Sequence, residues 1–238
     1  MAAPLHLELL GGARMTRGGA PLHFVTAKAA ALLCYLAVTG RPHSRTSIAA
    51  LLWSEHAEDD ARRNLRVVLS NLRQLVAPHL LITRETLAFD HTSAAWLDVD
   101  AFEAALRGAA PPDLARLGEA VGLYRGDFLE GFHVRSAPVF DEWAVAQPLA
   151  LRHRVLHALH VLVNAHIEQH AYAAGIDHCT LLLQLDPWSE DAHRQLMRLL
   201  VSSGQPAAAL AQYETCRRIL DDELGVQPSP ETLSLIHI

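Results

Sequence analysis

The segment from Glu58 to Val76 constrains this chain more than any other. Its apolar residues recur at helical spacing and form one stripe, which consists of Leu65, Val68, Leu69, Leu72, Leu75 and Val76. Polar side chains gather on the opposite face, where the spacing places Arg63, Arg66, Ser70, Arg73 and Gln74, with Arg62 and Asn64 at the margin. Asp59 and Asp60 lie at the helix start, where the helix dipole favours negative charge. The segment predicts an amphipathic helix whose outer face offers guanidinium and amide groups and hardly any carboxylates.

Such a face suits phosphate groups and the major-groove edges of guanine and adenine. A single arginine-rich helix is more often an ordinary solvated helix, so the assignment depends on the elements around it. Thr26 is expected to cap a helix from Ala27 to about Val38, and Ser44 a second helix from Arg45 to Leu52. After the arginine-rich helix, residues 80–83 and 86–89 predict two strands joined by a turn at Arg84 and Glu85. Three helices followed by a hairpin predict a winged helix-turn-helix with the third helix as recognition helix.

Short strands are expected before these helices. Residues 5–9 alternate between apolar and polar, which predicts a strand. The glycine pairs at 11–12 and 18–19 predict turns around a second strand, and residues 22–25 a third.

The charge of the chain is unevenly distributed. The net charge of −6 is unexpected for a protein that binds nucleic acid. Residues 1–99, however, contain 10 Lys and Arg against 8 Asp and Glu, whereas residues 100–238 contain 10 against 18. The basic surplus therefore belongs to the part with the arginine-rich helix, and the acidity belongs to a second module.

The second half of the chain predicts helices only. A helix begins near Asp98, another covers residues 113–124, and a long helical region starts near Val139, which Pro148 is expected to break or kink. The pattern then repeats after 34 residues, since Ala158, Leu162 and Ile176 match Ala192, Leu196 and Leu210. That period is typical of tetratricopeptide repeats. We therefore predict a mainly α protein with a small β part, in which residues 1–97 form a winged helix-turn-helix domain and residues 98–238 a helical tetratricopeptide-like repeat domain.

Some side chains are expected to be buried in this arrangement. Trp53, Trp143 and Trp188 are interpreted as core or inter-helix anchors rather than as platforms for stacked bases. Between the repeats, the predicted buried positions are Leu159, Leu162, Leu196, Leu199, Leu210 and Tyr213.

Other function classes find little support. His166 and His170 have a spacing that can bind zinc, but no Cys or carboxylate completes a site, so no metal and no cofactor are predicted. No phosphate-binding loop or nucleophile motif is present, which argues against an enzyme. Three widely spaced cysteines fit a reducing cytoplasm. The longest apolar run, Ala29 to Val38, is too short to span a bilayer, and no secretion signal opens the chain.

The sequence resembles the SARP family of bacterial transcriptional activators, in which an OmpR-like winged helix precedes a bacterial transcriptional activator domain. The resemblance covers nearly the whole chain and is carried by the segments at 51–53, 59–66, 69–73, 124–129, 186–187, 209–214 and 223–232. The family implies binding to direct repeats near promoters, self-association on DNA, contact with RNA polymerase and control of gene clusters for specialised metabolites.

By that resemblance, the arginines of the third helix lie at or near the DNA, and Arg84 on the wing approaches the minor groove or the backbone. The expected DNA-binding residues are Thr26, Lys28, Arg62, Arg63, Asn64, Arg66, Ser70, Arg73 and Arg84. The expected partners are double-stranded promoter DNA, RNA polymerase and further copies of the chain, with no membrane.

Two alternatives stay open. The chain ends in an apolar tail, residues 233–238, where the family has a further helix, so we expect a truncated or artificially ended reading frame. Because larger relatives continue into an ATPase, the chain is alternatively the N-terminal regulatory part of such a regulator. In the other alternative, the chain is a repeat scaffold whose winged helix binds protein rather than DNA.

Overall fold

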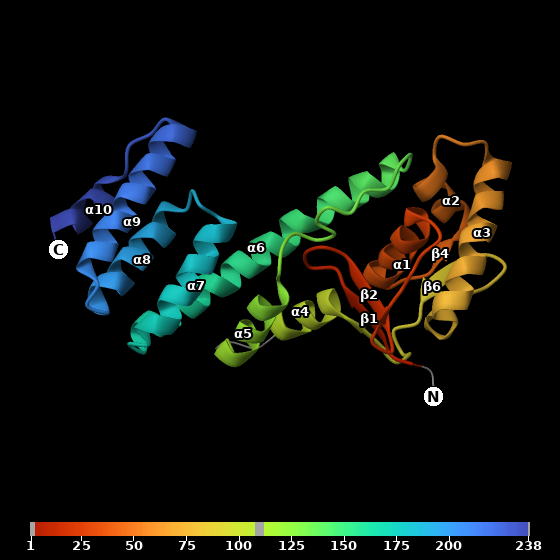
Figure 1. Cartoon of the computed structure of the whole chain (residues 1–238), viewed down its shortest axis with the longest axis horizontal. Helices are drawn as coiled ribbons and strands as arrows, with labels where there is room; N and C mark the ends of the chain where they lie inside the picture. Colours follow the sequence, from red (N-terminus) through yellow and green to blue (C-terminus); the bar gives the residue numbers. More distant parts are fainter. Residues whose placement is uncertain (1–2, 108–111, 238) are drawn as a thin grey trace. The chain divides into compact units, whose positions relative to one another are not determined.

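The computed structural model describes residues 3–107 and 112–237, and it is mainly helical with a small β part (Figure 1). The predicted fold class is confirmed. The chain forms two compact units, one of Met1–Arg107 with Gly122–Leu151 and one of Gly108–Val121 with Arg152–Ile238. The predicted domains, residues 1–97 and 98–238, follow the change in sequence pattern and do not coincide with these units. The predicted domain boundary stays a prediction.

Three helices form the centre of the first unit, and all three begin where the sequence predicts. They are α1 (Ala27–Thr39), α2 (Arg45–Trp53) and α3 (Glu58–Val76). The side chain of Thr26 accepts a hydrogen bond from the N–H of Ala29 at 3.3 Å, and Ser44 accepts from Ser47 at 3.0 Å. Both residues are therefore N-caps, as expected from their hydroxyls. Gly40 ends α1 with a φ of 62°, a conformation that glycine adopts without a steric penalty.

A small antiparallel sheet packs beside these helices. Its order is β4-β6-β5, formed by β4 (His43–Ser44), β5 (Leu80–Ile82) and β6 (Thr86–Phe89), with a short 3₁₀ turn η1 (Ala77–His79) before β5. The predicted hairpin is confirmed, and Thr83 closes its turn by accepting a hydrogen bond from the N–H of Thr86 at 2.8 Å. The sequence did not predict β4, since two residues are too short to show a strand pattern and the strand depends on pairing with β6.

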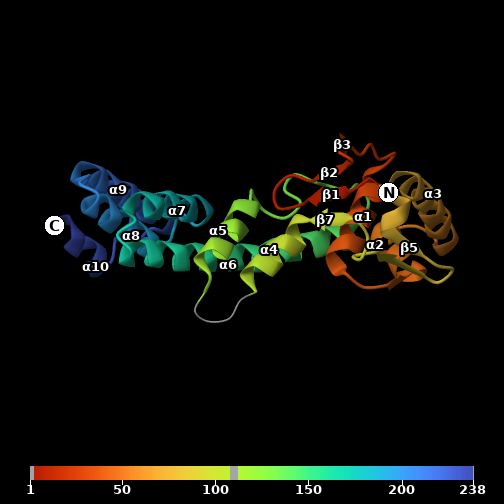
Figure 2. The same cartoon turned by 90° about the horizontal axis from the view of Figure 1, so that it is seen from below.

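The N-terminal strands form a second sheet of order β3-β2-β1-β7. Its members are β1 (Leu5–Glu8), β2 (Arg14–Arg17), β3 (Ala20–Pro21) and β7 (Ala95–Leu97). Figure 2 shows β7 beside β1, to which it pairs in parallel. The prediction of a third strand over residues 22–25 is wrong. β3 ends at Pro21, and Val25 instead lies exposed beside α3, to which its N–H donates a hydrogen bond.

Residues beyond 97 complete the first unit. Asp98, at the start of α4 (Asp98–Leu106), is fully buried, and its carboxylate accepts hydrogen bonds from the N–H groups of Leu9 and Leu10 at 2.7 and 2.9 Å. Phe128 packs against Trp143 with ring centroids 5.7 Å apart, and Trp143 packs against Tyr35 of α1 at 4.8 Å. The first unit therefore depends on side chains from residues 98–151.

The long helix α6 (Pro138–Glu168) is continuous, so the expected break at Pro148 is wrong, and a kink there stays a prediction. Proline removes one N–H from the helix, and the loss of a single hydrogen bond is tolerated when packing holds both sides. Phe140 before Pro148 and Leu151 after it are buried, and Gln147 donates a side-chain hydrogen bond to the carbonyl of Trp143 at 3.4 Å.

The second unit contains the predicted repeats. Its further elements are α5 (Leu114–Leu123, which reaches into the first unit by two residues), α7 (Tyr172–Leu185), α8 (Glu190–Ser202), α9 (Pro206–Ile219), the π-helical turn η2 (Leu220–Leu224), α10 (Pro230–Leu233) and the 3₁₀ turn η3 (Ser234–His237). Helix α8 packs against both α7 and α9. The positions confirmed as buried are Leu159, Leu162, Leu196, Leu199 and Tyr213.

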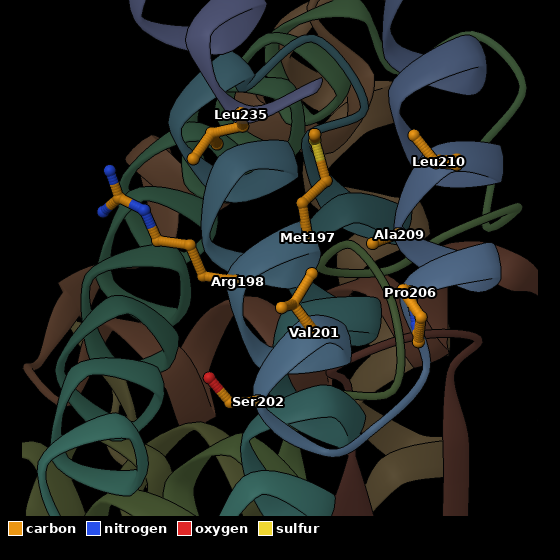
Figure 3. Close-up of a pocket in the computed structure, with 8 residues that line it drawn as sticks. All are labelled: Met197, Arg198, Val201, Ser202, Pro206, Ala209, Leu210 and Leu235. Carbon is orange, nitrogen blue, oxygen red and sulfur yellow. The ribbon is translucent and has the colours of Figure 1, made fainter. Parts of the chain in front are cut away.

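The prediction for Leu210 is wrong, because its side chain is 51% exposed. The buried residues of α9 are Ala209, Tyr213 and Cys216, and this spacing leaves Leu210 outside the buried face of the helix. Leu210 instead lines an apolar pocket of about 310 Å³ together with residues of α8 (Figure 3).

Two of the three tryptophans predicted as anchors pack as expected. Trp53 is buried and Trp143 packs among aromatic rings, as predicted. Trp188 is 48% exposed, so it is not a core residue. It follows α7 in the inter-repeat turn, and its indole N–H donates to Glu223 at 2.5 Å.

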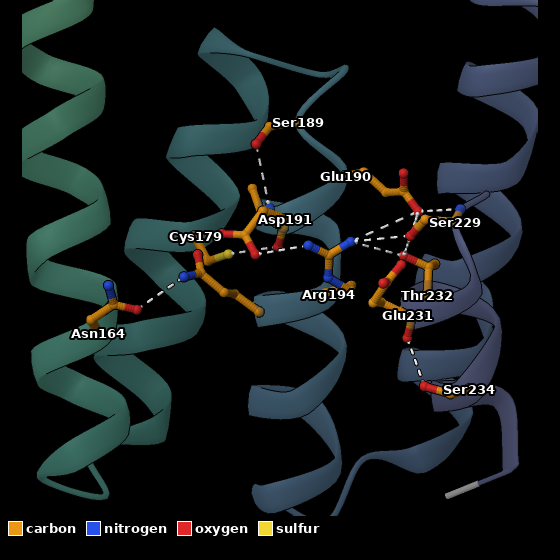
Figure 4. Close-up of polar contacts among 12 residues, drawn as sticks. Asn164, Cys179, Ser189, Glu190, Asp191, Arg194, Ser229, Glu231, Thr232 and Ser234 are labelled. Carbon is orange, nitrogen blue, oxygen red and sulfur yellow. Dashed lines mark hydrogen bonds and ion pairs between the residues drawn. The ribbon is translucent and has the colours of Figure 1, made fainter. Parts of the chain in front are cut away.

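A polar cluster ties the segment after η2 to α8 (Figure 4). Glu190 accepts hydrogen bonds at 2.7 Å from both the N–H and the hydroxyl of Ser229. The guanidinium of Arg194 donates to Asp191 at 3.0 Å, to Ser229 at 3.4 Å and to Thr232 at 3.3 Å. Because Thr232 is fully buried, these contacts fix α10 against α8.

Candidate nucleic-acid interface

The arginine-rich helix α3 folds as its pattern predicts. Its buried residues are Ala61, Leu65, Val68, Leu69, Leu72 and Val76. Arg62, Arg63, Arg66 and Arg73 are all exposed on the remaining surface. Two of them are paired within the helix, Arg62 with Glu58 and Arg63 with Asp60 at 3.0 Å. Within residues 3–107 and 112–237, Arg66 and Arg73 have no ion pair, so their guanidiniums are available to a ligand.

A basic cleft lies where α3 meets the start of α2 and the hairpin. Its volume is about 460 Å³, and the residues that line it are Ser44, Arg45, Thr46, Arg62, Leu65, Arg66, Arg84 and Glu85. Four of these side chains are guanidiniums, which stay charged at any physiological pH. Glu85 supplies the carboxylate in this lining, so the cleft has an excess of positive charge that suits phosphate.

Arg45 fixes the geometry of this cleft. Its guanidinium donates two hydrogen bonds to the carbonyl of Thr83, at 3.1 and 2.8 Å. The backbone N–H of Arg45 donates to the carbonyl of Glu85 at 2.9 Å. The start of α2 is thereby fastened to the hairpin turn that carries Arg84. Sequence reasoning missed Arg45, although one signal was present. A cation at the first position of a helix opposes the helix dipole, and such local conflicts are frequent at functional sites.

The segment before α1 borders α3 on its other side. The N–H of Val25 donates to the side-chain oxygen of Asn71 at 3.4 Å, and Thr26 follows directly. Thr26 is exposed, and its hydroxyl oxygen caps α1 while the O–H can still donate. On α3, Ser70 is exposed and Asn64 half-exposed. The structure thus gathers most of the predicted site residues on or beside one face of α3.

Lys28 lies apart from this face. Its ammonium group donates to the carbonyls of Leu52 at 2.6 Å and of Ser136 at 2.9 Å, and it lies 5.1 Å from the ring centre of Trp53. Partial burial lowers the pKa of Lys28, an effect that Glu55 opposes. Lys28 therefore satisfies the carbonyl of Leu52 at the end of α2 and that of Ser136. A DNA contact by Lys28 stays a prediction.

The histidines and cysteines form no alternative site in the described part of the chain. Residues 3–107 and 112–237 contain no group of three or more His, Cys, Asp or Glu side chains placed to hold a metal ion. His166 stacks on His178 with centroids 5.1 Å apart, whereas His170 contacts the hydroxyl of Tyr172 at 2.8 Å. The three cysteines are buried, and burial raises the pKa of Cys34 to about 12, of Cys179 to about 12 and of Cys216 to about 11. Burial and the raised pKa values keep these thiols in their neutral form near neutral pH.

Comparison with known families decides the class of this protein. The protein-family model described as "Bacterial transcriptional activator domain" matches residues 89–237. The chain belongs to this family. The resemblance to SARP-type transcriptional activators is confirmed.

Curated relatives are transcriptional regulators. The chain is 29% identical over 236 residues to "Regulatory protein AfsR" of Streptomyces coelicolor, a match that covers 95% of this chain and 23% of that protein. It is 24% identical over 253 residues to "Transcriptional regulatory protein MoaR1" of Mycobacterium bovis, covering 99% of this chain and 79% of that protein. The chain thus spans about a quarter of the AfsR proteins it matches.

A solved structure has the same fold. It is that of Mycobacterium tuberculosis EmbR in complex with a low affinity phosphopeptide, with a TM-score of 0.69 and 24% identity. The match covers 99% of this chain and 64% of EmbR.

The described residues contain no helix with the length and hydrophobicity needed to cross a membrane.

Proposed function

We propose that this protein is a sequence-specific DNA-binding transcriptional activator, without catalytic activity, that acts on promoter DNA in the bacterial cytoplasm. The observation that carries the proposal is the exposed face of α3, where Arg66 and Arg73 have no ion pair among the described residues, next to a cleft lined by four arginines. Unpaired guanidiniums on a helix that fits the major groove are the groups that recognise guanine and phosphate. Family membership supports the same function.

In this proposal, the residues of the interface contact two different parts of the DNA, the base edges and the phosphate backbone. Arg63, Ser70 and Arg73 lie on the outward side of α3, where they would meet base edges in the major groove. Arg45, Arg62 and Arg66 line the cleft and would hold the phosphate backbone that passes it. Arg84 on the hairpin turn would contact the backbone or the minor groove as a wing.

The repeat domain has a different proposed role. Residues 100–238 have a net charge of −8, so DNA phosphates would repel them. Stacked helical repeats offer an extended surface for protein partners. We assign self-association or contact with RNA polymerase to this domain.

A second candidate function follows from the length of the relatives. The chain spans 23% of the AfsR of Streptomyces coelicolor, which favours the alternative of an N-terminal regulatory part of a larger, ATPase-containing regulator. In the remaining alternative, the winged helix binds protein. The excess of guanidiniums over carboxylates at the cleft favours a polyanion instead.

Selection from random DNA duplexes, followed by fluorescence anisotropy at two salt concentrations, tests the proposal. We expect one enriched sequence that binds far more tightly than scrambled DNA, with an affinity that falls as salt rises. Enrichment of no sequence, together with equal affinity for scrambled DNA, would contradict sequence-specific binding and favour the protein-binding alternative.

A further inference from the structure

An exposed valine lies within the polar face of α3. Val67 is 63% exposed, follows Arg63 by four residues and precedes Ser70 by three, so the three side chains share one face. An exposed valine adds nothing to the core, and its branched side chain lowers helix propensity. The fold of the described unit therefore does not require valine at this position.

A second exposed valine borders the same face. Val25 is 76% exposed, and its N–H donates to the side-chain oxygen of Asn71. Asn71 lies about one helical turn after Val67. The hydrogen bond therefore holds Val25 beside the turn of α3 that follows Val67, and the two valines extend the apolar part of an otherwise polar face.

We propose that Val67, with Val25 beside it, contacts the methyl groups of thymines in the major groove and thereby sets a preference for A·T pairs at these positions. The inference rests on the proposed function, since it requires that α3 enters the groove. Of the groups that base pairs present there, the methyl group of thymine is the apolar one. Arg63 and Ser70 on either side recognise polar base edges, so Val67 supplies the complementary part of the readout.

The expected size of the contact follows from methyl burial. Removing one buried methyl group costs about 0.8 kcal/mol, which corresponds to about a fourfold loss of affinity. A contact of this size is measurable at a single thymine.

Replacement of single thymines by deoxyuridine, which lacks only the methyl group, tests the proposal on the full chain and its selected duplex. We expect wild-type protein to lose about fourfold in affinity at one or two thymines. The variant Val67→Ala should bind the parent duplex more weakly and lose nothing further at the same thymines. Val145→Ala, which changes a valine that is 76% exposed on α6, is the matched control and should show the wild-type pattern.

The outcomes separate this inference from the proposed function. If Val67→Ala keeps the same loss at the same thymines, or if wild-type protein is sensitive to no thymine methyl, the inference is wrong while specific binding stands. If Val67→Ala changes only the cooperativity between bound copies, Val67 belongs to a protein contact and the inference is also wrong. If no duplex is bound specifically, the proposed function fails and the inference fails with it. Circular dichroism and thermal unfolding establish that each variant is folded.

Discussion

Helices α3 and α8 both have one apolar and one charged face, yet their arginines are used differently. On α8, Arg194 is half-buried and bound to Asp191, Ser229 and Thr232. On α3, Arg66 and Arg73 are exposed and have no ion pair within the described residues. An arginine held by several partners within the fold stabilises the fold, whereas an arginine without such partners is available to a ligand. Contacts within the fold therefore distinguish an arginine with a structural role from one that is available to a ligand.

The stability of the first unit should depend on a buried charge rather than on its exposed arginines. Asp98→Ala removes the acceptor of two buried N–H groups, those of Leu9 and Leu10. An unsatisfied buried donor costs about 1–3 kcal/mol, so we expect a loss of about 3 kcal/mol in the free energy of unfolding. Urea denaturation measures this value. The control Asp100→Ala removes an exposed contact with His91 and should cost less than about 1 kcal/mol. Equal losses for the two variants would contradict the role assigned to Asp98.

The exposed arginines of α3 should matter for binding and not for stability. We expect Arg66→Ala or Arg73→Ala to weaken DNA binding by about 1–3 kcal/mol where the side chain contacts a base pair. A phosphate contact would instead lower the salt slope by about one unit and leave sequence preference unchanged. Anisotropy titrations at several salt concentrations distinguish the two. Wild-type affinity and salt slope in a folded variant would remove that arginine from the interface.

Arg194 on α8 should show the opposite behaviour. Arg194→Ala breaks the contacts that fix α10 to α8, and because the side chain is partly exposed we expect a loss of about 1 kcal/mol in unfolding free energy. DNA affinity should be unchanged. The matched variant Arg198→Ala, exposed on the same helix, should change neither quantity. A loss of DNA affinity in Arg194→Ala with the fold intact would contradict the comparison.

The smallest effect is expected for Lys28. Lys28→Met removes two hydrogen bonds to backbone carbonyls but keeps the packing against Trp53, so we expect a loss of about 0.5–1 kcal/mol in stability. Thermal unfolding and anisotropy on the same sample separate stability from binding. A clear loss of DNA affinity at unchanged stability would support the predicted DNA contact of Lys28 and contradict a purely structural role.

Sequence patterns predicted the parts of this fold that local interactions determine. The start of α1 at Thr26, the start of α2 at Ser44 and the whole of α3 follow from caps and helical periodicity. The strands β4 and β7 were missed because each has only two or three residues and exists through pairing with a distant strand. The burial of Leu210 was predicted wrongly because a repeat period does not determine how α9 is rotated about its axis.

The candidate site, too, could be predicted from the sequence only where local spacing along one helix determines it. The arginines of α3 follow from spacing along one helix. Arg45 joins the cleft only when α2 meets the hairpin turn, and the ammonium group of Lys28 reaches the carbonyl of Leu52. Neither contact is visible in a local pattern.

A matched charge reversal tests most directly whether the α3 face, rather than overall charge, binds DNA. The double variant Arg66→Glu with Arg73→Glu on α3 and the double variant Arg198→Glu with Arg218→Glu on the repeats change the net charge equally, and all four side chains are exposed. Anisotropy with the selected duplex at low salt gives both affinities. We predict a loss of more than about a hundredfold for the α3 variant, since the proposed base contact of Arg73 and phosphate contact of Arg66 are both replaced by repulsion. The repeat variant should stay within about threefold of wild type, because the proposed DNA contacts belong to α3, α2 and the hairpin and not to the repeats. Equal losses in the two variants would contradict the account.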